Sequence, residues 1–399
     1  MLSPREAQRL IADSVALLPT DSVRLEHCAG RILRQSVSAE RDQPPFDRVT
    51  MDGIAIDYAT LAGGQREFPI AFTLHAGDPA RRLEEPTRCA EVMTGSVLPD
   101  GADTVIPVER LRVDSDVAHI EESCSPDEGQ FVHRRATDHR AGTALLNVGH
   151  RVTPLDVAIV ASAGLTHVDV ARQPSARIVS TGNELVQAGA SIEPHQVRLS
   201  NGPALVAMLE RAGFPDSRAD HLLDDRQELE DKLATHLAET DVLILSGGVS
   251  MGKADFVPDV LAKLGVKKRF HRVSQRPGKP MWFGTGAAGQ AVFALPGNPV
   301  SALVCCRHYV LPALFHASGL SPQPTASAVL ERDVAFAPAL TYFLPVRLLS
   351  DNDGRRLAQP ILTNTSGDFT ALSGTDGYVE LSAEDSEFPA GTSAPFHRW

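Results

Sequence analysis

The strongest constraint on the fold is an alternation of short apolar strands and amphipathic helices that begins after Pro174. Strands are predicted at 177–180, 242–246 and 291–295, and helices at 203–212, 226–239, 256–264 and 299–316. Asparagine or aspartate stands shortly before a proline or glutamate at the start of three of these helices, which is a typical helix-start signal. Short apolar strands between helices form a parallel sheet that is covered on both faces. We therefore predict an α/β domain over residues 173–317.

Each predicted strand leads into a polar loop that is rich in glycine or proline. The loops are STGNE at 180–184, SGGVSMGKAD at 246–255 and LPGNPVS at 295–301. In open parallel sheets, ligands bind beyond the carboxyl ends of the strands, where such loops meet. Glycines let backbone amides approach a ligand, and a helix start favours negative charge. Any one loop could be a plain strand–helix turn, but the three together predict a site for a phosphate-bearing ligand.

The second loop also matches the nucleotide-binding pattern GxxxxGK between Gly247 and Lys253. A P-loop continues with serine or threonine, whose hydroxyl holds magnesium, and this chain has Ala254 there. The pattern is therefore a weak argument for a kinase or an ATPase.

The segment 272–280 carries three cations, Arg272, Arg276 and Lys279, around the turn Pro277-Gly278. A solvated surface charge run is the alternative interpretation. The chain as a whole has a net charge of −12, however, and surface runs rarely include so constrained a turn. We therefore predict that these cations bind an oxyanion.

Carboxylates accompany the polar loops, with Glu184, Asp224 and Asp255 at strand–helix junctions. Helix capping alone could explain Asp224 and Asp255. Carboxylates beside a polyphosphate repel it unless a hard cation lies between them, which favours a Mg²⁺ site. The 14 histidines show no HxxxH or HExxH spacing, so none is assigned as a zinc ligand.

The remaining chain divides into three further parts by composition. Residues 41–139 are rich in short strand-like runs and turns, which predicts a mostly β domain inserted into a helical region formed by 1–40 and 140–172. Residues 325–399 are predicted to form a separate small β domain. A capping box, Ser3 to Glu6, begins the first helix, so the N-terminus is not read as a signal peptide.

Cysteine content, the length of apolar runs and net charge indicate where the protein is located and which partners it has. The five cysteines include no CxxC pair, which favours reduced thiols and a cytoplasmic location over a disulfide framework or a zinc site. No apolar run has the roughly 20 residues that a membrane helix needs. The acidic balance argues against nucleic acid as a partner.

An ordered set of short segments resembles the molybdopterin molybdenumtransferases of the MoeA type, a family that includes the C-terminal domain of gephyrin. The matching segments, over nearly the whole chain, are Pro45-Phe46-Asp47, Met51-Asp52-Gly53, Met93-Thr94-Gly95, 101–105, 180–185, Ser200-Asn201-Gly202, 246–255, 277–280 and 295–301. The resemblance implies a multidomain α/β plus β fold. A molybdopterin-binding α/β/α domain with a mostly parallel sheet would be joined to an inserted β domain on a helical stalk and to a small C-terminal β-barrel.

The resemblance also implies the reaction. Molybdate is inserted into adenylylated molybdopterin, AMP leaves, and Mg²⁺ is required. A homodimer is implied, with Asp52, Thr94 and Asp138 of one chain facing the α/β domain of the other. Other proteins of molybdenum cofactor biosynthesis are further expected partners.

Site roles follow from the same resemblance. Catalytic roles fall to Asp52, Thr94, Asp138, Glu184 and Asp255, and the metal ligands would be Asp224, Asp255 and Glu184. Molybdate would be held by Arg276, Lys279, Ser301 and Ser366. The pterin phosphate or adenylate would lie against Gly247, Gly248 and Asn298. The complete substrate-binding set is Gly247, Gly248, Ser250, Arg272, Arg276, Lys279, Pro296, Asn298, Pro299, Ser301 and Ser366.

Several positions depart from the family pattern. Arg272 and Arg276 stand where lysines are common, and Asn183 replaces a frequent aspartate. Pro345 stands where an arginine is expected near molybdate, although Arg347 follows two residues later and would share its side of a regular strand. Two alternatives therefore stay open. One is adenylyl transfer to molybdopterin, which is disfavoured because Gly-Gly-Val-Ser replaces the Gly-Gly-Thr-Gly loop associated with it. The other is a scaffold that keeps the fold without catalysis.

Overall fold

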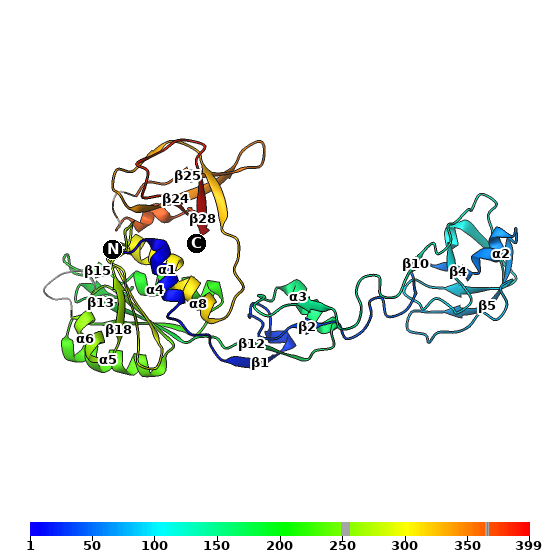
Figure 1. Cartoon of the computed structure of the whole chain (residues 1–399), viewed down its shortest axis with the longest axis horizontal. Helices are drawn as coiled ribbons and strands as arrows, with labels where there is room; N and C mark the ends of the chain where they lie inside the picture. Colours follow the sequence, from blue (N-terminus) through cyan, green and yellow to red (C-terminus); the bar gives the residue numbers. More distant parts are fainter. Residues whose placement is uncertain (249–255, 364, 366) are drawn as a thin grey trace. The chain divides into compact units, whose positions relative to one another are not determined.

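The computed structural model describes residues 1–248, 256–363, 365 and 367–399. The chain forms two compact units (Figure 1). The first contains Met1–Arg34, Val148–Thr153 and Val168–Trp399, and the second contains Gln35–Asn147 and Pro154–His167. The second unit is thus inserted in the chain of the first.

The first unit is built on a six-stranded sheet with the order β16-β13-β17-β21-β20-β18. Its members are β13 (Ala176–Thr181), β16 (Ser217–Leu222), β17 (Val242–Ser246), β18 (Lys267–His271), β20 (Trp282–Thr285) and β21 (Ala291–Leu295). The strands β16, β13, β17 and β21 are parallel to one another; β20 is antiparallel to β21, and β18 is antiparallel to β20. The parallel strands place their carboxyl ends at one edge, as the sequence predicts.

Helices cover both faces of this sheet because alternate strand residues point to opposite sides. Leu243 and Leu245 pack with α5 and α6, whereas Val242 and Ile244 pack with the helices of the other face. Figure 1 shows α5 and α6 on one face and α1, α4 and α8 on the other. The helices are α1 (Pro4–Ala12), α4 (Asn201–Ala212), α5 (Arg226–Glu239), α6 (Val257–Lys263), α7 (Pro299–Cys305) and α8 (Leu311–Ala317).

The N-terminal helix α1 begins with the predicted capping box, in which Ser3 and Glu6 exchange hydrogen bonds. Its apolar face belongs to the core of the α/β domain, where Ala7 and Ile11 are buried. The last two helices are joined by a π-helical turn, η3 (Cys306–Val310), into one run, Pro299–Ala317. This run is long and apolar enough to span a membrane by length and composition alone, but 72% of it is buried inside the protein as a core helix.

The C-terminal part of the first unit is a small barrel with its own core. Its strands are β19 (Gln275–Arg276), β22 (Ala326–Leu330), β24 (Thr341–Ser350), β25 (Arg356–Pro360), β26 (Gly377–Leu381) and β28 (Ser393–Arg398). They follow the order β19-β24-β25-β22-β28-β26, and a further β24–β26 pairing closes the ring. The short pair β23 (Val334–Ala335) and β27 (Glu387–Phe388) and the turn η4 (Phe369–Leu372) complete the barrel.

The second unit contains a six-stranded sheet of order β7-β4-β6-β5-β9-β8. Its strands are β4 (Gly53–Ile56), β5 (Glu67–Leu74), β6 (Cys89–Val92), β7 (Thr104–Pro107), β8 (Leu111–Asp114) and β9 (Val117–Ile120). Apolar side chains form a core on each face of the sheet. The unit also contains α2 (Tyr58–Ala62), α3 (Pro154–Ser162) and the pairs β2 (Val37–Ser38) with β11 (Ala144–Leu146) and β3 (Arg48–Val49) with β10 (Val132–His133). The domain boundaries written from the sequence remain predictions.

Candidate functional site

A cavity of about 630 Å³ lies beyond the carboxyl ends of β13 and β17. Its lining comes from the three polar loops, from the start of α4, from the short pair β14 (Leu185–Val186) and β15 (Val197–Arg198), and from the C-terminal barrel. The lining residues are Ser180, Thr181, Gly182, Glu184, Leu185, Val197, Arg198, Leu199, Ser200, Asn201, Asp224, Ser246, Gly247, Gly248, Gly297, Asn298, Pro299, Gly367 and Phe369. The cavity therefore lies at the edge where ligands bind in sheets of this type.

The structure brings six of the predicted site residues together in this cavity. They are Glu184, Asp224, Gly247, Gly248, Asn298 and Pro299. Pro296 and Ser301 are buried and do not line the cavity, and Arg272, Arg276 and Lys279 lie outside it. The predicted residues Ser250, Asp255 and Ser366 lie outside the described residues.

Glycine is required at both positions of the pair that follows β17, because of the backbone conformation there and because other atoms lie close to each Cα. Gly247 and Gly248 have φ angles of 100° and 67°, which L side chains rarely adopt. A Cβ on Gly248 would lie 2.5 Å from Cγ2 of Val257, and one on Gly247 would lie 2.8 Å from the carbonyl oxygen of Thr181. Both positions therefore accept only glycine without rearrangement, and they leave backbone exposed toward the cavity.

Three buried polar atoms at the cavity have no hydrogen-bond partner among the described residues. They are Oγ of Ser180, Oγ1 of Thr181 and Oδ1 of Asn201. The amide of Asn201 is held in place, because Nδ2 donates to Oγ of Ser246 at 2.8 Å and to the carbonyl of Gly297 at 2.7 Å. Buried polar groups nearly always have a partner. These three atoms indicate hydrogen bonds to a ligand; the sequence places Ser180 and Thr181 in a predicted site loop but gives none of the three side chains a role.

The two carboxylates of the cavity repel one another. The pKa of Asp224 is raised, first by burial and then by the nearby charge of Glu184. Oδ1 of Asn183 accepts the backbone N–H of Asp224 at 3.0 Å, so Asn183 positions this loop even though it offers no carboxylate. Two hard oxygen donors that repel one another match a divalent hard cation such as Mg²⁺. The residues present therefore fit the metal that the family resemblance implies.

The predicted oxyanion turn joins the α/β domain to the barrel, because β19 pairs in parallel with β24. Arg276 and Lys279 are exposed and form no ion pair with any described carboxylate. The guanidinium of Arg276 lies 5.9 Å from the ring centre of Phe336. The side-chain amide of Gln275 donates a hydrogen bond to the carbonyl oxygen of Pro277 at 3.0 Å, and this bond stabilises the turn. The two cations are therefore held on a constrained turn with their charges available.

The substitution at Pro345 lies on β24 opposite Tyr378. Leu344 and Val346 point into the barrel core, so Pro345 and Arg347 share the other face, as regular strand geometry predicts. Nε of Arg347 donates to the carbonyl of Gly374 at 3.2 Å, and its side chain is exposed. An arginine is therefore present on the expected side of the strand.

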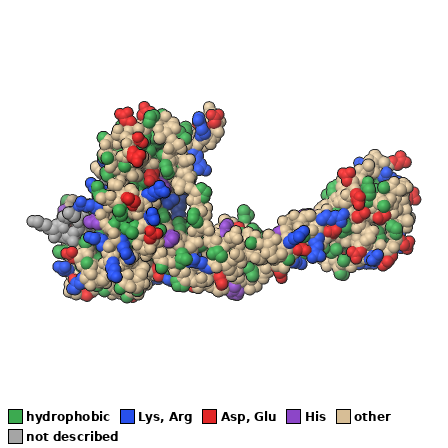
Figure 2. Space-filling model, in the orientation of Figure 1, with side chains coloured by type: hydrophobic (Ala, Val, Ile, Leu, Met, Phe, Trp, Pro, Cys, Tyr) green, Lys and Arg blue, Asp and Glu red, His purple; other side chains and the backbone are tan. Residues whose placement is uncertain are grey.

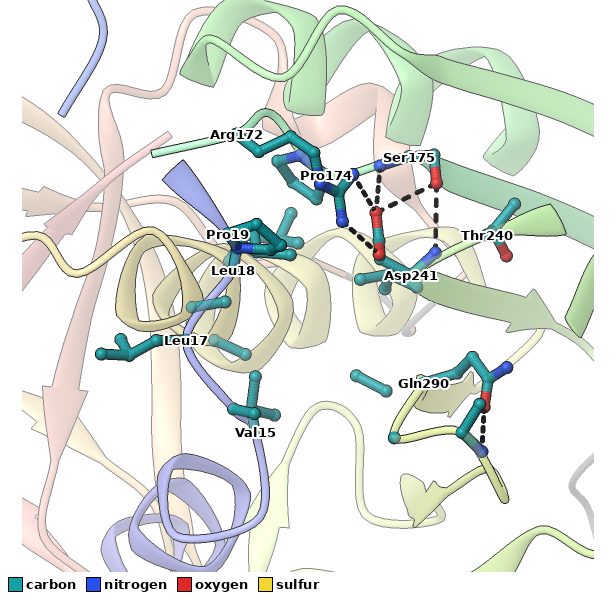
Figure 3. Close-up of a pocket in the computed structure, with 18 of the residues that line it drawn as sticks. Val15, Leu17, Leu18, Pro19, Arg172, Pro174, Ser175, Thr240, Asp241 and Gln290 are labelled. Carbon is teal, nitrogen blue, oxygen red and sulfur yellow. Dashed lines mark hydrogen bonds and ion pairs between the residues drawn. The ribbon is translucent and has the colours of Figure 1, made fainter. Parts of the chain in front are cut away.

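A second cavity, of about 470 Å³, lies at the opposite edge of the sheet (Figure 3). Its polar groups bind one another. Arg172 donates to both carboxylate oxygens of Asp241 at 2.9 and 2.7 Å, and the N–H of Ser175 donates to the same carboxylate at 2.9 Å. These partnered groups tie the starts of β13 and β17 together. The cavity thus has a structural explanation, and we assign the function to the carboxyl edge.

The predicted catalytic residues of the second unit form two local contacts. The backbone N–H and Oγ1 of Thr94 donate to Oδ1 of Asp52 at 2.6 and 2.7 Å, which lowers the pKa of this exposed carboxylate. Oδ1 of Asp138 lies 3.1 Å from Nε2 of His133. Asp52 is therefore an ionised group held in a fixed position.

Charge on the visible surface is mixed. In Figure 2, Lys and Arg side chains as well as Asp and Glu side chains appear on the face shown.

The fold and the site define a multidomain α/β protein with a polar cavity beyond the strand ends of its central sheet. Three family models match the chain: "MoeA N-terminal region (domain I and II)" at residues 2–164, "Probable molybdopterin binding domain" at 177–316 and "MoeA C-terminal region (domain IV)" at 327–399. The chain belongs to the molybdopterin molybdenumtransferase family and is an enzyme of the transferase class.

Individual relatives agree with this assignment. The chain is 39% identical over 371 residues to a molybdopterin molybdenumtransferase of Synechocystis sp., with 93% of each chain covered. It is 30% identical to that of Bacillus subtilis, covering 91% of this chain and 86% of the relative. A crystal structure of the molybdopterin biosynthesis MoeA protein from Pyrococcus horikoshii superposes with a TM-score of 0.83 at 27% identity, covering 100% of this chain and 99% of that one. The predicted family and the predicted multidomain fold are confirmed.

Proposed function

We propose that this enzyme inserts molybdate into adenylylated molybdopterin, with hydrolysis of the phosphoanhydride and release of AMP. The family assignment supports the transfer of molybdenum. The observation that carries the proposal is the cavity at the strand ends, where a glycine turn, three unpartnered polar atoms and a pair of carboxylates meet. The reduced, buried cysteines are in keeping with a cytoplasmic enzyme.

The cavity supplies separate contacts for the parts of the substrate. The backbone at Gly247 and Gly248 and the start of α7 at Asn298 are assigned to the phosphates, because exposed backbone N–H groups and a helix start favour negative charge. Ser180, Thr181 and Asn201 are assigned to polar edges of the pterin or the adenine. These groups bind and orient the phosphoanhydride before it is cleaved.

Asp224 and Glu184, together with Asp255 from the segment outside the described residues, are assigned to hold Mg²⁺. When bound, this ion would neutralise charge on the phosphoanhydride and on the leaving phosphate. These carboxylates would determine where the ion lies, and therefore where charge on the leaving phosphate is stabilised. Asn183 keeps Asp224 oriented through its hydrogen bond to the Asp224 N–H.

Molybdate is assigned to Arg276 and Lys279, with Ser301 and Ser366 completing its site and Arg272 adding charge nearby. Two exposed cations on a constrained turn suit a small tetrahedral dianion. Ser301 is buried in α7.

Replacing Lys279 with alanine is expected to raise the KM for molybdate roughly tenfold, because a hydrogen bond to a charged group is lost. The affinity for adenylylated molybdopterin is expected to change by less than about twofold, because Lys279 does not line the cavity. Steady-state kinetics at varied molybdate and a separate ligand titration measure the two quantities. Lys268→Ala, which removes an exposed lysine from β18, is the control. Equal losses in both quantities would contradict the assignment.

The proposal includes a homodimer in which Asp52, Thr94 and Asp138 of one chain act with the α/β domain of its partner. We expect Asp52→Asn and Asp224→Asn each to be inactive as homodimers. A heterodimer purified by two different tags would contain one intact site and one doubly altered site, so roughly half of the wild-type activity is expected. A heterodimer as inactive as its parents would show that both residues serve a site within one chain.

The reaction assay tests the proposal as a whole. Purified protein is incubated with adenylylated molybdopterin, molybdate and Mg²⁺, and AMP and active cofactor are measured. Release of AMP with cofactor formation is expected. Formation of adenylylated molybdopterin from ATP would instead indicate the adenylyltransferase alternative, and substrate binding without turnover would indicate a scaffold.

A further inference from the structure

The C-terminal barrel meets the core helix at a buried polar cluster that the proposed reaction does not use. Val300 and Val304 of the helix pack against Phe343 and Tyr378 of the barrel. Beside this apolar contact, the π-helical turn η3 places His308 against the sheet of the C-terminal barrel. Only 1% of the surface of His308 is exposed. π-Helical turns often mark functional positions, which makes this histidine a candidate for a further role.

The barrel side of the cluster follows from strand register. Tyr378 and Glu380 are two residues apart in β26 and therefore point to the same face. His397 in β28 lies directly opposite Tyr378. Hence Glu380 and His397 both face the helix that carries His308.

One nitrogen or oxygen atom from each of His308, Glu380 and His397 lies within 4.8 Å of the others. Nε2 of His397 lies 3.0 Å from Oε2 of Glu380. Nδ1 of His308 lies 3.0 Å from the hydroxyl of Tyr378. Nε2 of His308 is buried and has no hydrogen-bond partner among the described residues. A buried ring nitrogen without a partner is costly, and it indicates an occupant that the protein itself does not supply.

The donor set selects the class of occupant. Two imidazoles and one carboxylate are ligands for zinc and similar divalent transition metals, and they are a poor set for Mg²⁺ or Ca²⁺. A metal-bound histidine usually forms a hydrogen bond through its other ring nitrogen, and Tyr378 occupies that position at His308. One observation opposes the binding of a cation here: the positively charged Arg307 lies close to His308. Nε of Arg307, however, donates a hydrogen bond to the carbonyl oxygen of Arg398.

We propose that His308, Glu380 and His397 bind one zinc-class divalent cation, which fastens the C-terminal barrel to the core helix of the α/β domain. None of the three residues lines the cavity at the strand ends, so this site is distinct from the Mg²⁺ site assigned to Glu184 and Asp224. The core helix that carries His308 begins at Pro299, which lines the cavity. The barrel contributes Gly367 and Phe369 to the lining of the same cavity. A metal at the junction would therefore fix the position of the barrel part of the cavity wall relative to the part formed by the core helix.

The test is a metal titration of the full-length protein. Chelator-treated enzyme is titrated with Zn²⁺, and separately with Co²⁺, in buffer that contains millimolar Mg²⁺ to occupy the carboxylate site. We expect one equivalent of Zn²⁺ to bind and the melting temperature to rise, because a ligand that binds only the folded state stabilises it. Co²⁺ is expected to develop visible ligand-field absorption, a signal that a purely structural histidine cluster would not produce.

Variants assign the signal to the three side chains. His397→Gln and Glu380→Gln are each expected to weaken Zn²⁺ binding by more than about 100-fold, because each removes a direct ligand, and Tyr378→Phe by about 10- to 100-fold. His316→Ala, which removes an exposed histidine from α8, and Asp224→Asn are expected to keep wild-type Zn²⁺ affinity. Circular dichroism identifies any variant that does not fold, and the two Gln variants report independently. Failure of the wild type to bind one equivalent, or loss of that equivalent in Asp224→Asn, would overturn the proposal.

Discussion

The Asp224→Asn enzyme is expected to lose AMP release by roughly 10²- to 10³-fold, the usual effect of removing one electrostatic stabiliser of developing charge. Asp224 lines the cavity at the end of β16 and repels Glu184, whose charge contributes to its raised pKa. Asparagine is nearly the same size but cannot supply a charged oxygen to Mg²⁺. Turnover should therefore fail while the cavity keeps its shape.

The same substitution is expected to raise the melting temperature in metal-free buffer near neutral pH. A carboxylate whose pKa is raised in the folded state favours the folded state when protonated, and this contribution is lost as the pH rises through that pKa. At neutral pH the ionised Asp224 is repelled by Glu184, and asparagine removes that repulsion. The gain should shrink as the pH falls and the wild-type carboxylate becomes protonated.

The neighbouring Asp225 provides a matched control for both effects. Its carboxylate caps α5 by accepting the N–H of Glu228 at 2.8 Å. Asparagine is an equally good helix cap, so Asp225→Asn removes one charge at the adjacent position without removing the cap. Near-wild-type turnover is expected for Asp225→Asn. Equal losses in the two variants would show that general charge near the cavity, rather than a metal ligand, accounts for the effect.

Gly248→Ala is the second change for which we expect a large effect, a loss of turnover of about 100-fold or more. A left-handed φ of 67° costs a non-glycine residue about 1–2 kcal/mol. The added Cβ would also lie 2.5 Å from Val257 and 2.9 Å from Oγ1 of Thr181. Because Val257 is buried at the start of α6, the turn itself must move, and it carries the backbone assigned to the substrate phosphates.

Gly289→Ala separates backbone strain from damage to the site. Gly289 has a φ of 91° and no atom within 4 Å of an added Cβ, and it lies at the second cavity on the opposite edge of the sheet. Both variants are expected to lose some stability, as thermal unfolding will measure. Only Gly248→Ala should also lose binding of adenylylated molybdopterin in a ligand titration. Unchanged ligand affinity in Gly248→Ala would refute the phosphate-binding role of this turn.

The sequence predicts those parts of the fold whose local pattern agrees with their burial. The apolar runs that form β13, β17 and β21 are central strands buried on both faces, and the capping box begins α1 as expected. The sequence does not predict β16 and β18, which lie at the edges of the sheet. Their sequences, SRADHL and KKRFH, are polar because edge strands are partly exposed. The helix expected at 299–316 contains a π-helical turn that no local pattern indicates.

The structure brings together those predicted site residues that lie in short motifs at strand ends. The glycine turn and the carboxylates Glu184 and Asp224 follow strand ends, so strand order alone brings them together. The sequence does not predict a role for the side chains of Ser180, Thr181 and Asn201, because an unpartnered buried atom is a property of the packed fold. His308, Glu380 and His397 lie on three separate elements, so no spacing rule for metal ligands detects them.

The most direct test of the account is the stoichiometry of AMP and active cofactor in a single turnover. Enzyme in excess over adenylylated molybdopterin is mixed with molybdate and Mg²⁺, and AMP is quantified alongside reconstitution of a molybdenum-free apoenzyme. We predict equal amounts of AMP and active cofactor from the wild type and neither product above background from Asp224→Asn. No AMP from the wild type, or undiminished AMP from Asp224→Asn, would contradict the claim that this cavity carries out molybdenum transfer.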